Sequence, residues 1–170
     1  ESFPVTAMRL ALFGAGHVAS ALMQVLAQCD SRIEWVDSRQ EQFPVSVSAN
    51  VRLVCVDDPV AYVNELTDAH RCIIITHDHA LDYQLTHKVL TETEIDYVGL
   101  IGSDTKAKRF YARLEKDGVS EDDRKRCRCP IGMPAVKGKL PMEIAVSVAA
   151  QILSLDRVKA SQIKPDLTWK

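Results

Sequence analysis

The sequence has none of the features that mark a membrane or nucleic-acid protein. No apolar run approaches the roughly 20 residues that a membrane-spanning helix needs, and no secretory signal peptide is visible. The formal net charge is only −2, so no excess of positive charge favours nucleic acid or acidic lipid. We therefore expect neither nucleic acid nor a membrane among the partners.

The chain also lacks the cysteine pattern of a disulfide-stapled secreted domain. Its five cysteines are an odd number spread over predicted strands and one loop, which is typical of reduced thiols in a cytoplasm. At 170 residues the chain suits one domain that buries about 70% of its unfolded surface without such staples. The proportions of hydrophobic residues (46%) and charged residues (26%) are those of an ordinary globular protein. The sequence predicts a soluble cytoplasmic domain.

Short apolar runs alternate along the chain with helix-length amphipathic segments. This alternation predicts an α/β fold, a Rossmann-like doubly wound and mostly parallel sheet with helices on both faces. The predicted strands are residues 8–13, 33–37, 51–56, 72–76 and 97–101. The predicted helices are residues 18–28, 59–66, 80–91, 104–116 and 141–153.

The predicted Rossmann-like domain covers residues 8–155. Because the chain begins with Glu1 rather than Met, we interpret residues 1–7 as a linker or the remnant of a preceding segment. The polar residues 120–128 are expected to form an exposed loop or a short helix. Residues 156–170 are expected to form a weakly ordered C-terminal tail.

A glycine-rich turn follows the first predicted strand. Residues 14–19, Gly-Ala-Gly-His-Val-Ala, fit the dinucleotide fingerprint G-x-G-x-x-G/A between a strand and a helix. Gly14 permits the tight turn, Gly16 lets a pyrophosphate approach the backbone, and Ala19 keeps helix and strand close. The start of the helix offers N–H groups and partial positive charge to an anion. We predict a phosphate-bearing ligand here, and the alternative is a tight turn without a ligand.

An acidic residue ends the second predicted strand at the distance that the fingerprint requires. Asp37 lies about 20 residues beyond the turn, where a carboxylate would accept hydrogen bonds from ribose hydroxyls. Asp37 alone favours an unphosphorylated ribose. Arg39, two residues later, leaves a phosphorylated ribose open.

Two histidines and two acids follow the fourth predicted strand. His77, Asp78, His79 and Asp82 would lie at the carboxyl edge of the sheet, where open α/β folds bind ligands. His77 and His79 are two residues apart, which suits a loop rather than one helix face, and the sequence names no third metal ligand. We expect both histidines to line the ligand crevice without binding structural zinc. The alternative is that Asp78 or His79 only caps the next helix.

A second anion-friendly turn follows the fifth predicted strand. Gly102 and Ser103 predict a strand-to-helix turn with a serine cap. Lys106 and Arg109 are three apart on one helical face near the start of that helix, where cations oppose the helix dipole by some tenths of a kcal/mol. We therefore expect both to be kept for a bound phosphate, and the alternative is a solvated basic face.

The pair Cys127 and Cys129 precedes a proline-glycine loop. A C-x-C pair could hold a soft metal, but no second cysteine pair lies nearby. The loop could instead reach back to the ligand crevice, or serve packing alone.

These segments occur in an order that resembles a known family. They read FGAGHVA, WVDSR followed by FP, THDHALD, GLIGSDTKAKRF, CPIGM and KLPMEIAVSVAA. From about Met8 to Leu153 the chain resembles the C-terminal Rossmann domain of the XdhC/CoxI family, the xanthine dehydrogenase accessory proteins. THDH, GLIGS and PIG in that order are more specific than the glycine turn alone.

The resemblance implies an accessory role rather than an enzymatic one. Members of the family it resembles bind the molybdenum cofactor (molybdopterin or its dinucleotide), protect it, support its sulfuration and help insert it into xanthine dehydrogenase or a related molybdenum hydroxylase. A cysteine desulfurase is a further expected partner, we expect a homo-oligomer, and full-length members have an N-terminal domain with a cysteine implicated in cofactor handling. By motif, the resemblance places cofactor-binding candidates at Gly14, Gly16, His17, Val18, Asp37, Arg39, His77, Asp78, His79, Asp82, Gly102, Ser103, Lys106 and Arg109. It implies neither a catalytic residue nor a metal ligand among them.

Two other functions remain open on the sequence. A Rossmann cradle also suits an NAD(P)-dependent oxidoreductase, although a dehydrogenase normally needs a substrate domain, and only a short segment follows the fifth predicted strand. The third interpretation is a regulatory domain that senses a nucleotide.

Overall fold

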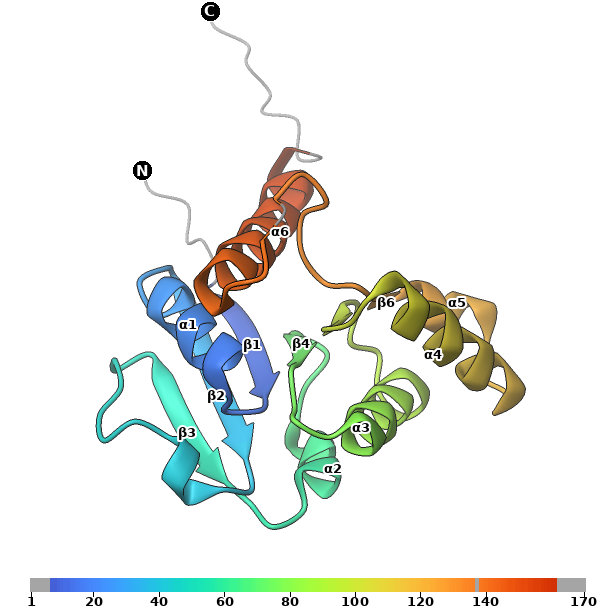
Figure 1. The fold of residues 1–170 in the computed structure, drawn as a ribbon, viewed down its shortest axis with the longest axis horizontal. Helices are drawn as coiled ribbons and strands as arrows, with labels where there is room; N and C mark the ends of the chain where they lie inside the picture. Colours follow the sequence, from blue (N-terminus) through green and yellow to red (C-terminus); the bar gives the residue numbers. More distant parts are fainter. Residues whose placement is uncertain (1–6, 137, 162–170) are drawn as a thin grey trace, which may run out of the picture.

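A computed structural model describes residues 7–136 and 138–161 of the chain (Figure 1). The six strands of this described part lie in one parallel sheet in the order β3-β2-β1-β4-β5-β6. The chain moves outward from β1 to β3 and then crosses to β4, so the gap between β1 and β4 is the switch point of a doubly wound sheet. The strands are β1 (Met8–Phe13), β2 (Ser31–Asp37), β3 (Val51–Cys55), β4 (His70–Ile74), β5 (Val98–Leu100) and β6 (Cys127–Arg128).

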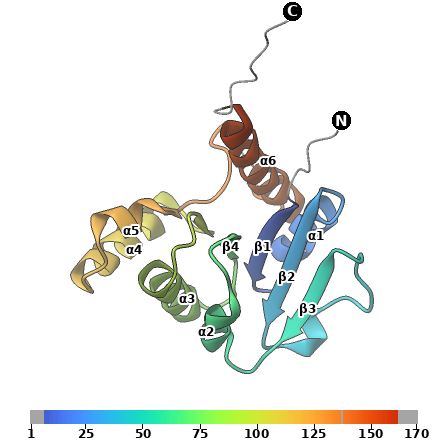
Figure 2. The same ribbon diagram turned by 180° about the vertical axis from the view of Figure 1, so that it is seen from behind.

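Helices pack on both faces of this sheet, which confirms the predicted fold class. One face packs against α1 and α6, which lie side by side in both ribbon views, and the other packs against α3 and α4 (Figures 1 and 2). The helices are α1 (His17–Leu26), α2 (Pro59–Tyr62), α3 (His79–Glu92), α4 (Asp104–Lys116), α5 (Glu121–Lys125) and α6 (Pro141–Ser161), with short 3-10 turns η1 (Gln40–Gln42) and η2 (Val63–Glu65). None of the described helices has the length and apolar character needed to span a membrane.

Strand β1 shows why the central strands read as continuous apolar runs. Successive side chains of a strand point to opposite faces. Leu10 and Leu12 therefore enter the core beneath α1 and α6, whereas Ala11 and Phe13 enter the core beneath α3. All four are buried because helices cover both faces at this level.

Apart from shifts of one or two residues at element ends, the structure differs from the predicted elements at three places. Predicted helix 59–66 divides into α2 and η2, although the expected cap is present, since Asp58 accepts hydrogen bonds from the backbone of Val60 and Ala61. Within the polar segment 120–128, the short helix α5 is followed by β6, a strand of two residues that no periodicity could reveal.

The third difference is the length of the last helix. Helix α6 continues to Ser161, past the end predicted near Leu153, because no glycine or proline interrupts the segment after Pro141. The predicted tail therefore begins inside this helix. Residues 1–6 of the predicted linker 1–7, and the remainder of the tail, 162–170, lie outside the described residues.

Candidate functional site

The glycine turn is fixed against both neighbours of β1. Gly14 has φ +108°, and a Cβ atom there would lie 2.1 Å from the carbonyl oxygen of Ile75, just beyond β4. Its N–H donates to the carbonyl of Val36 at 2.8 Å, and its own carbonyl accepts from the buried indole N–H of Trp35 at 2.8 Å. Gly14 is therefore required by the close approach of β1, β2 and β4, and its first role is structural.

Gly16 has a different environment from Gly14. It is the N-cap of α1 with φ −78°, and a Cβ atom there would meet nothing within 4 Å. No side chain caps α1, whose first N–H groups therefore remain available to an anion. His17 is exposed beside this opening, whereas Val18 packs against the core below α1. By contrast, side chains cap the N-termini of α2, α3, α4 and α5, namely Asp58, Asp78, Ser103 and Ser120.

Asp37 holds the glycine turn from the end of β2. Its carboxylate is only 5% exposed and accepts four hydrogen bonds. The Ala15 N–H donates to Oδ2 at 2.7 Å, and Arg39 donates through its backbone N–H, Nε and a terminal guanidinium nitrogen, each at 2.9 Å. Four donors fill the lone-pair positions of a carboxylate. The predicted hydrogen bond from a ribose hydroxyl would therefore need Arg39 to move away.

The contacts of Asp37 predict a pH-dependent contribution to stability. Burial alone would raise the pKa of Asp37, but the hydrogen bonds from Arg39 and Ala15 and the charge of Arg39 outweigh it, so the pKa lies below the usual 3.8. A carboxyl with a lowered folded-state pKa contributes stability above its unfolded pKa and loses it as the pH falls through the folded value. We expect Asp37→Ala to lower the free energy of unfolding by about 2 kcal/mol at pH 7 and by clearly less near pH 2.5.

Urea unfolding at the two pH values would measure this difference. The control is Asp57→Ala, because Asp57 is an exposed carboxylate near the end of β3 and should change stability little at either pH. An equal loss for Asp37→Ala at both pH values would mean that packing, rather than the carboxylate charge, holds the turn.

The structure divides the predicted site residues between two places. The first is the crevice at the switch point, and the second, called the second hollow below, is a hollow of about 640 Å³ between α3 and α4. Gly14, Asp37 and His77 line the narrow switch-point crevice at the ends of β1, β2 and β4. The second hollow is lined by His79, Gly102, Ser103, Lys106 and Arg109, together with Tyr83, Ile101, Thr105, Phe110 and Arg113.

A buried carboxylate connects these two places. Asp82 is fully buried, and its Oδ1 accepts from the backbone N–H of Thr76 at 3.2 Å and from the Thr76 hydroxyl at 2.7 Å. Its Oδ2 accepts from Lys106 Nζ at 2.8 Å, and the same ammonium donates to the carbonyl of Ile101 at 3.0 Å. Gly102 leaves room for this arrangement, because a Cβ atom there would lie 2.8 Å from Cδ of Lys106. Asp82 thus joins the end of β4 to the start of α4.

This network corrects the interpretation of Lys106. Its charge near the start of α4 was expected to need a bound phosphate, but Asp82 already balances it. Arg109 is different, because it is exposed and makes no hydrogen bond or ion pair within residues 7–136 and 138–161. Of the two predicted cations, Arg109 therefore stays the candidate for binding an anion.

The two histidines face different hollows. His77 is exposed at the switch point. His79, the first residue of α3, lines the second hollow with its Nδ1 3.7 Å from Oδ2 of Asp82. Among the described residues, no group of three or more His, Cys, Asp or Glu side chains is arranged to hold a metal ion. Asp78 caps α3 by accepting from the backbone of Ala80 and Leu81, so the capping alternative is correct for this residue.

The two cysteines near β6, Cys127 and Cys129, differ in burial, and neither belongs to a group of three or more potential metal ligands among the described residues. Burial raises the pKa of the Cys127 thiol to about 12, and burial also raises the pKa of the half-buried Cys129. Both thiols are therefore protonated at neutral pH. The Cys129 sulfur lies beside Gly102, since it would be 3.2 Å from a Cβ atom there.

Sequence reasoning missed two residues that shape the site. Trp35 holds the carbonyl of the glycine turn, and Thr76 holds Asp82. The sequence does show Trp35 two residues before Asp37, and Thr76 directly before His77. Their roles depend on hydrogen bonds between segments that are distant in the sequence.

The sheet order, with its switch point between β1 and β4, defines a Rossmann-type α/β domain. Residues 10–152 match the family described as the XdhC Rossmann domain, and the chain belongs to this family.

Two known proteins are similar over most of this chain. The uncharacterized protein YqeB of Escherichia coli (strain K12) is 30% identical over 148 residues, which cover 86% of this chain and 27% of YqeB. A Bacillus halodurans crystal structure, described as a xanthine dehydrogenase, shares the fold with a TM-score of 0.75 and 24% identity, covering 92% of this chain and 45% of that one. The chain thus spans less than half the length of either protein.

Proposed function

We propose that this domain binds the molybdenum cofactor within a maturation chaperone. In this role it would hold molybdopterin or its dinucleotide during sulfuration by a cysteine desulfurase and during insertion into xanthine dehydrogenase or a related molybdenum hydroxylase. Membership of the XdhC Rossmann family supports the accessory role. The observation that carries the proposal is the start of α1, where Gly16 leaves open space and no side chain caps the helix.

The residues at this opening fit the phosphate of the cofactor. The first N–H groups of α1 point outward and the helix dipole favours negative charge there. A side chain at Gly16 would fill the open space that a phosphate needs to reach the backbone. When bound, the cofactor would bring the pyranopterin and molybdenum that the hydroxylase later uses for redox chemistry, while this chain contributes binding and protection.

The contacts of Asp37 bear on the alternative of an NAD(P)-dependent oxidoreductase. Such an enzyme uses the strand-ending acid to hold ribose hydroxyls, but Ala15 and Arg39 already occupy the acceptors of Asp37. The phosphate cradle is therefore better supported than the ribose contact. Nicotinamide-dependent turnover that disappears in Asp37→Ala would favour the oxidoreductase instead.

A substitution at Gly16 tests the proposed cradle. We expect Gly16→Val to keep the fold, because the position is open and its φ is accessible to any residue, but to weaken molybdopterin binding at least about tenfold by filling the phosphate position. Fluorescence titration with molybdopterin and thermal unfolding would measure the two effects.

The control is Ala80→Val, which also ends in a valine side chain but places it at the exposed start of α3, a helix that Asp78 caps. It should bind as the parent does. A folded Gly16→Val protein that binds molybdopterin with unchanged affinity would overturn the proposal.

A further inference from the structure

One part of the sheet carries charge instead of a covering helix. On the face that packs against α3, β1 begins with Arg9 before the buried Ala11, and β2 begins with Arg32 and Glu34 before the buried Val36. The connection from β2 to β3 contains only η1, and the connection from β3 to β4 contains only α2 and η2. In Figure 2 the strands β1, β2 and β3 are seen from this face with α2 and α3 beside them rather than across them.

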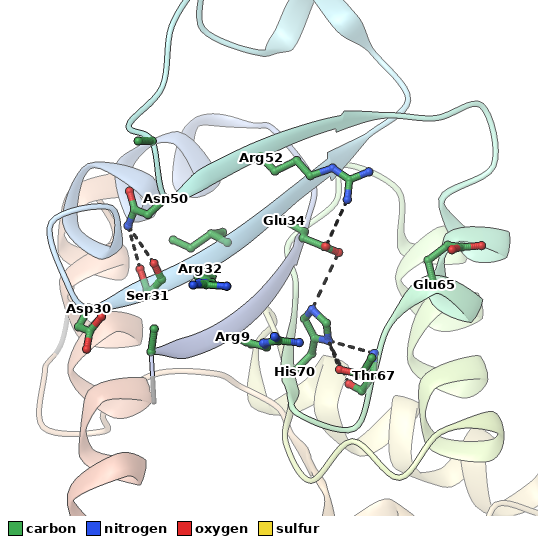
Figure 3. A pocket seen from close by; sticks show the side chains of 13 residues that line it. Arg9, Asp30, Ser31, Arg32, Glu34, Asn50, Arg52, Glu65, Thr67 and His70 are labelled. Atoms are coloured by element: carbon green, nitrogen blue, oxygen red, sulfur yellow. Dashed lines mark hydrogen bonds and ion pairs between the residues drawn. The ribbon is translucent and has the colours of Figure 1, made fainter. Parts of the chain in front are cut away.

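This open part of the sheet is a hollow of about 840 Å³ (Figure 3). The strand register places Arg9 opposite Arg32 on β2 and opposite His70 on β4. Neighbouring strands lie about 4.8 Å apart, so the two arginines leave the sheet side by side. Like charges directly opposite each other destabilise a sheet. Arg9 and Arg32 are both exposed, and neither makes a hydrogen bond or ion pair within the described part of the chain.

The acid between these arginines and Arg52, Glu34, has other partners and does not neutralise the arginine pair. Glu34 accepts a hydrogen bond from the Tyr62 hydroxyl at 2.9 Å, lies 3.6 Å from Arg52 and lies 4.0 Å from Nε2 of His70. Figure 3 shows Glu34 on the side of the hollow toward Arg52 and His70, while no interaction is drawn to Arg9 or Arg32. The pair therefore presents two guanidinium groups whose charge no carboxylate of the described residues contacts.

We propose that Arg9 and Arg32 form a binding site for the phosphate group of a small molecule. Adjacent guanidinium groups can each donate two hydrogen bonds to the oxygens of one phosphate, and the bound anion would remove the repulsion between them. The site lies at the amino ends of the strands, away from the glycine turn at their carboxyl ends. It does not depend on the proposed cofactor function.

The rim of the hollow restricts the ligand to a compact one. Asp30 and Glu65 lie on opposite sides of the arginine pair in Figure 3, so an extended polyanion would meet a carboxylate in either direction. Their oxygens can instead accept hydrogen bonds from hydroxyl or ammonium groups. The chemistry of the hollow thus fits a phosphomonoester that carries such groups.

Amide NMR spectroscopy can distinguish this site from the glycine turn. We expect inorganic phosphate, titrated at constant ionic strength, to give saturable shifts of the Arg9 and Arg32 amides. Arg32→Gln should weaken the response at Arg9 at least about tenfold and leave any response at His17 unchanged. Lys108→Gln, which removes the same charge from an exposed position on α4, should change neither.

Three results would overturn this site. The first is the absence of a saturable shift at Arg9 and Arg32. The second is an Arg32→Gln response equal to that of the parent. The third is a hexaglutamate peptide that shifts these amides at lower concentration than phosphate, which would make the surface a docking site for an acidic polypeptide. Gly16→Val should leave the Arg9 response intact, so failure of the cofactor proposal and failure of this one are distinguishable.

Discussion

Replacing Gly14 with alanine is expected to lower the free energy of unfolding by about 3 kcal/mol or more. The added Cβ atom would lie 2.1 Å from the carbonyl oxygen and 2.6 Å from the carbonyl carbon of Ile75. Both atoms belong to the backbone, so β1 and β4 would have to separate at the switch point. The φ of +108° adds strain of its own for a residue with a side chain. Overpacking and backbone strain each cost about 1 to 3 kcal/mol, and here they act together.

The control for this prediction is Gly16→Ala. A Cβ atom at Gly16 meets nothing within 4 Å and its φ of −78° is ordinary, so we expect a change of no more than about 1 kcal/mol. Urea unfolding of the two variants and the parent gives the comparison. If the Gly14→Ala protein is insoluble while the Gly16→Ala protein folds, the prediction is supported as well, because insolubility then reflects a large loss of stability. If Gly14→Ala were as stable as the parent, the contact between the glycine turn and β4 would have to be looser than described.

The two glycines show what a fingerprint can and cannot predict. The sequence placed both correctly between a strand and a helix, because the apolar run before them and the amphipathic segment after them are local signals. The pattern does not reveal that Gly14 is required by the segment at the end of β4, more than fifty residues away, whereas a Cβ atom at Gly16 would meet nothing within 4 Å. A substitution experiment guided by the fingerprint alone would treat a folding defect and a binding defect as the same result.

Local signals also explain which elements were predicted with correct bounds. Strand β1 and helix α4 match their predicted ranges, since one is a continuous apolar run and the other follows a serine cap. Strand β4 was predicted two residues late, because it begins with His70 and Arg71, polar residues that the fold nevertheless buries. Neither polarity nor periodicity in the sequence shows that other segments supply partners for these side chains.

The electrostatics of the candidate site were the least predictable part. The sequence identified Asp37, Arg39 and Lys106 as charged residues near phosphate-friendly turns. It could not show that Asp37 and Arg39 satisfy each other, because this depends on rotamers at the end of β2. Nor could it show the alignment of Arg9 with Arg32, which follows from the register between β1 and β2. Charge pairing across strands and helices is a property of the packed molecule.

The pairing of Lys106 with Asp82 leads to an expected loss of stability on removing the lysine charge. Lys106→Met keeps the length of the apolar stem but leaves the buried carboxylate of Asp82 with the two Thr76 donors and His79, whose Nδ1 is 3.7 Å away. Removing one partner of a buried ion pair costs about 3 to 5 kcal/mol, and we expect about 3 kcal/mol because the Lys106 side chain keeps 17% exposure. Thermal and urea unfolding of the variant would measure the loss.

The sign of this effect decides between two accounts of Lys106. If the lysine only opposed the dipole of α4, its removal would stabilise the protein by up to about 1 kcal/mol. The control is Lys108→Met, because Lys108 is an exposed neighbour on the same helix and makes no contact with Asp82. This variant should change the free energy of unfolding by less than about 0.5 kcal/mol. The double variant Lys106→Met/Asp82→Asn should recover part of the loss, because it removes the uncompensated charge together with its partner. A neutral or stabilising Lys106→Met would mean that Asp82 is held by Thr76 alone, and Lys106 would again be free to bind an anion beside Arg109.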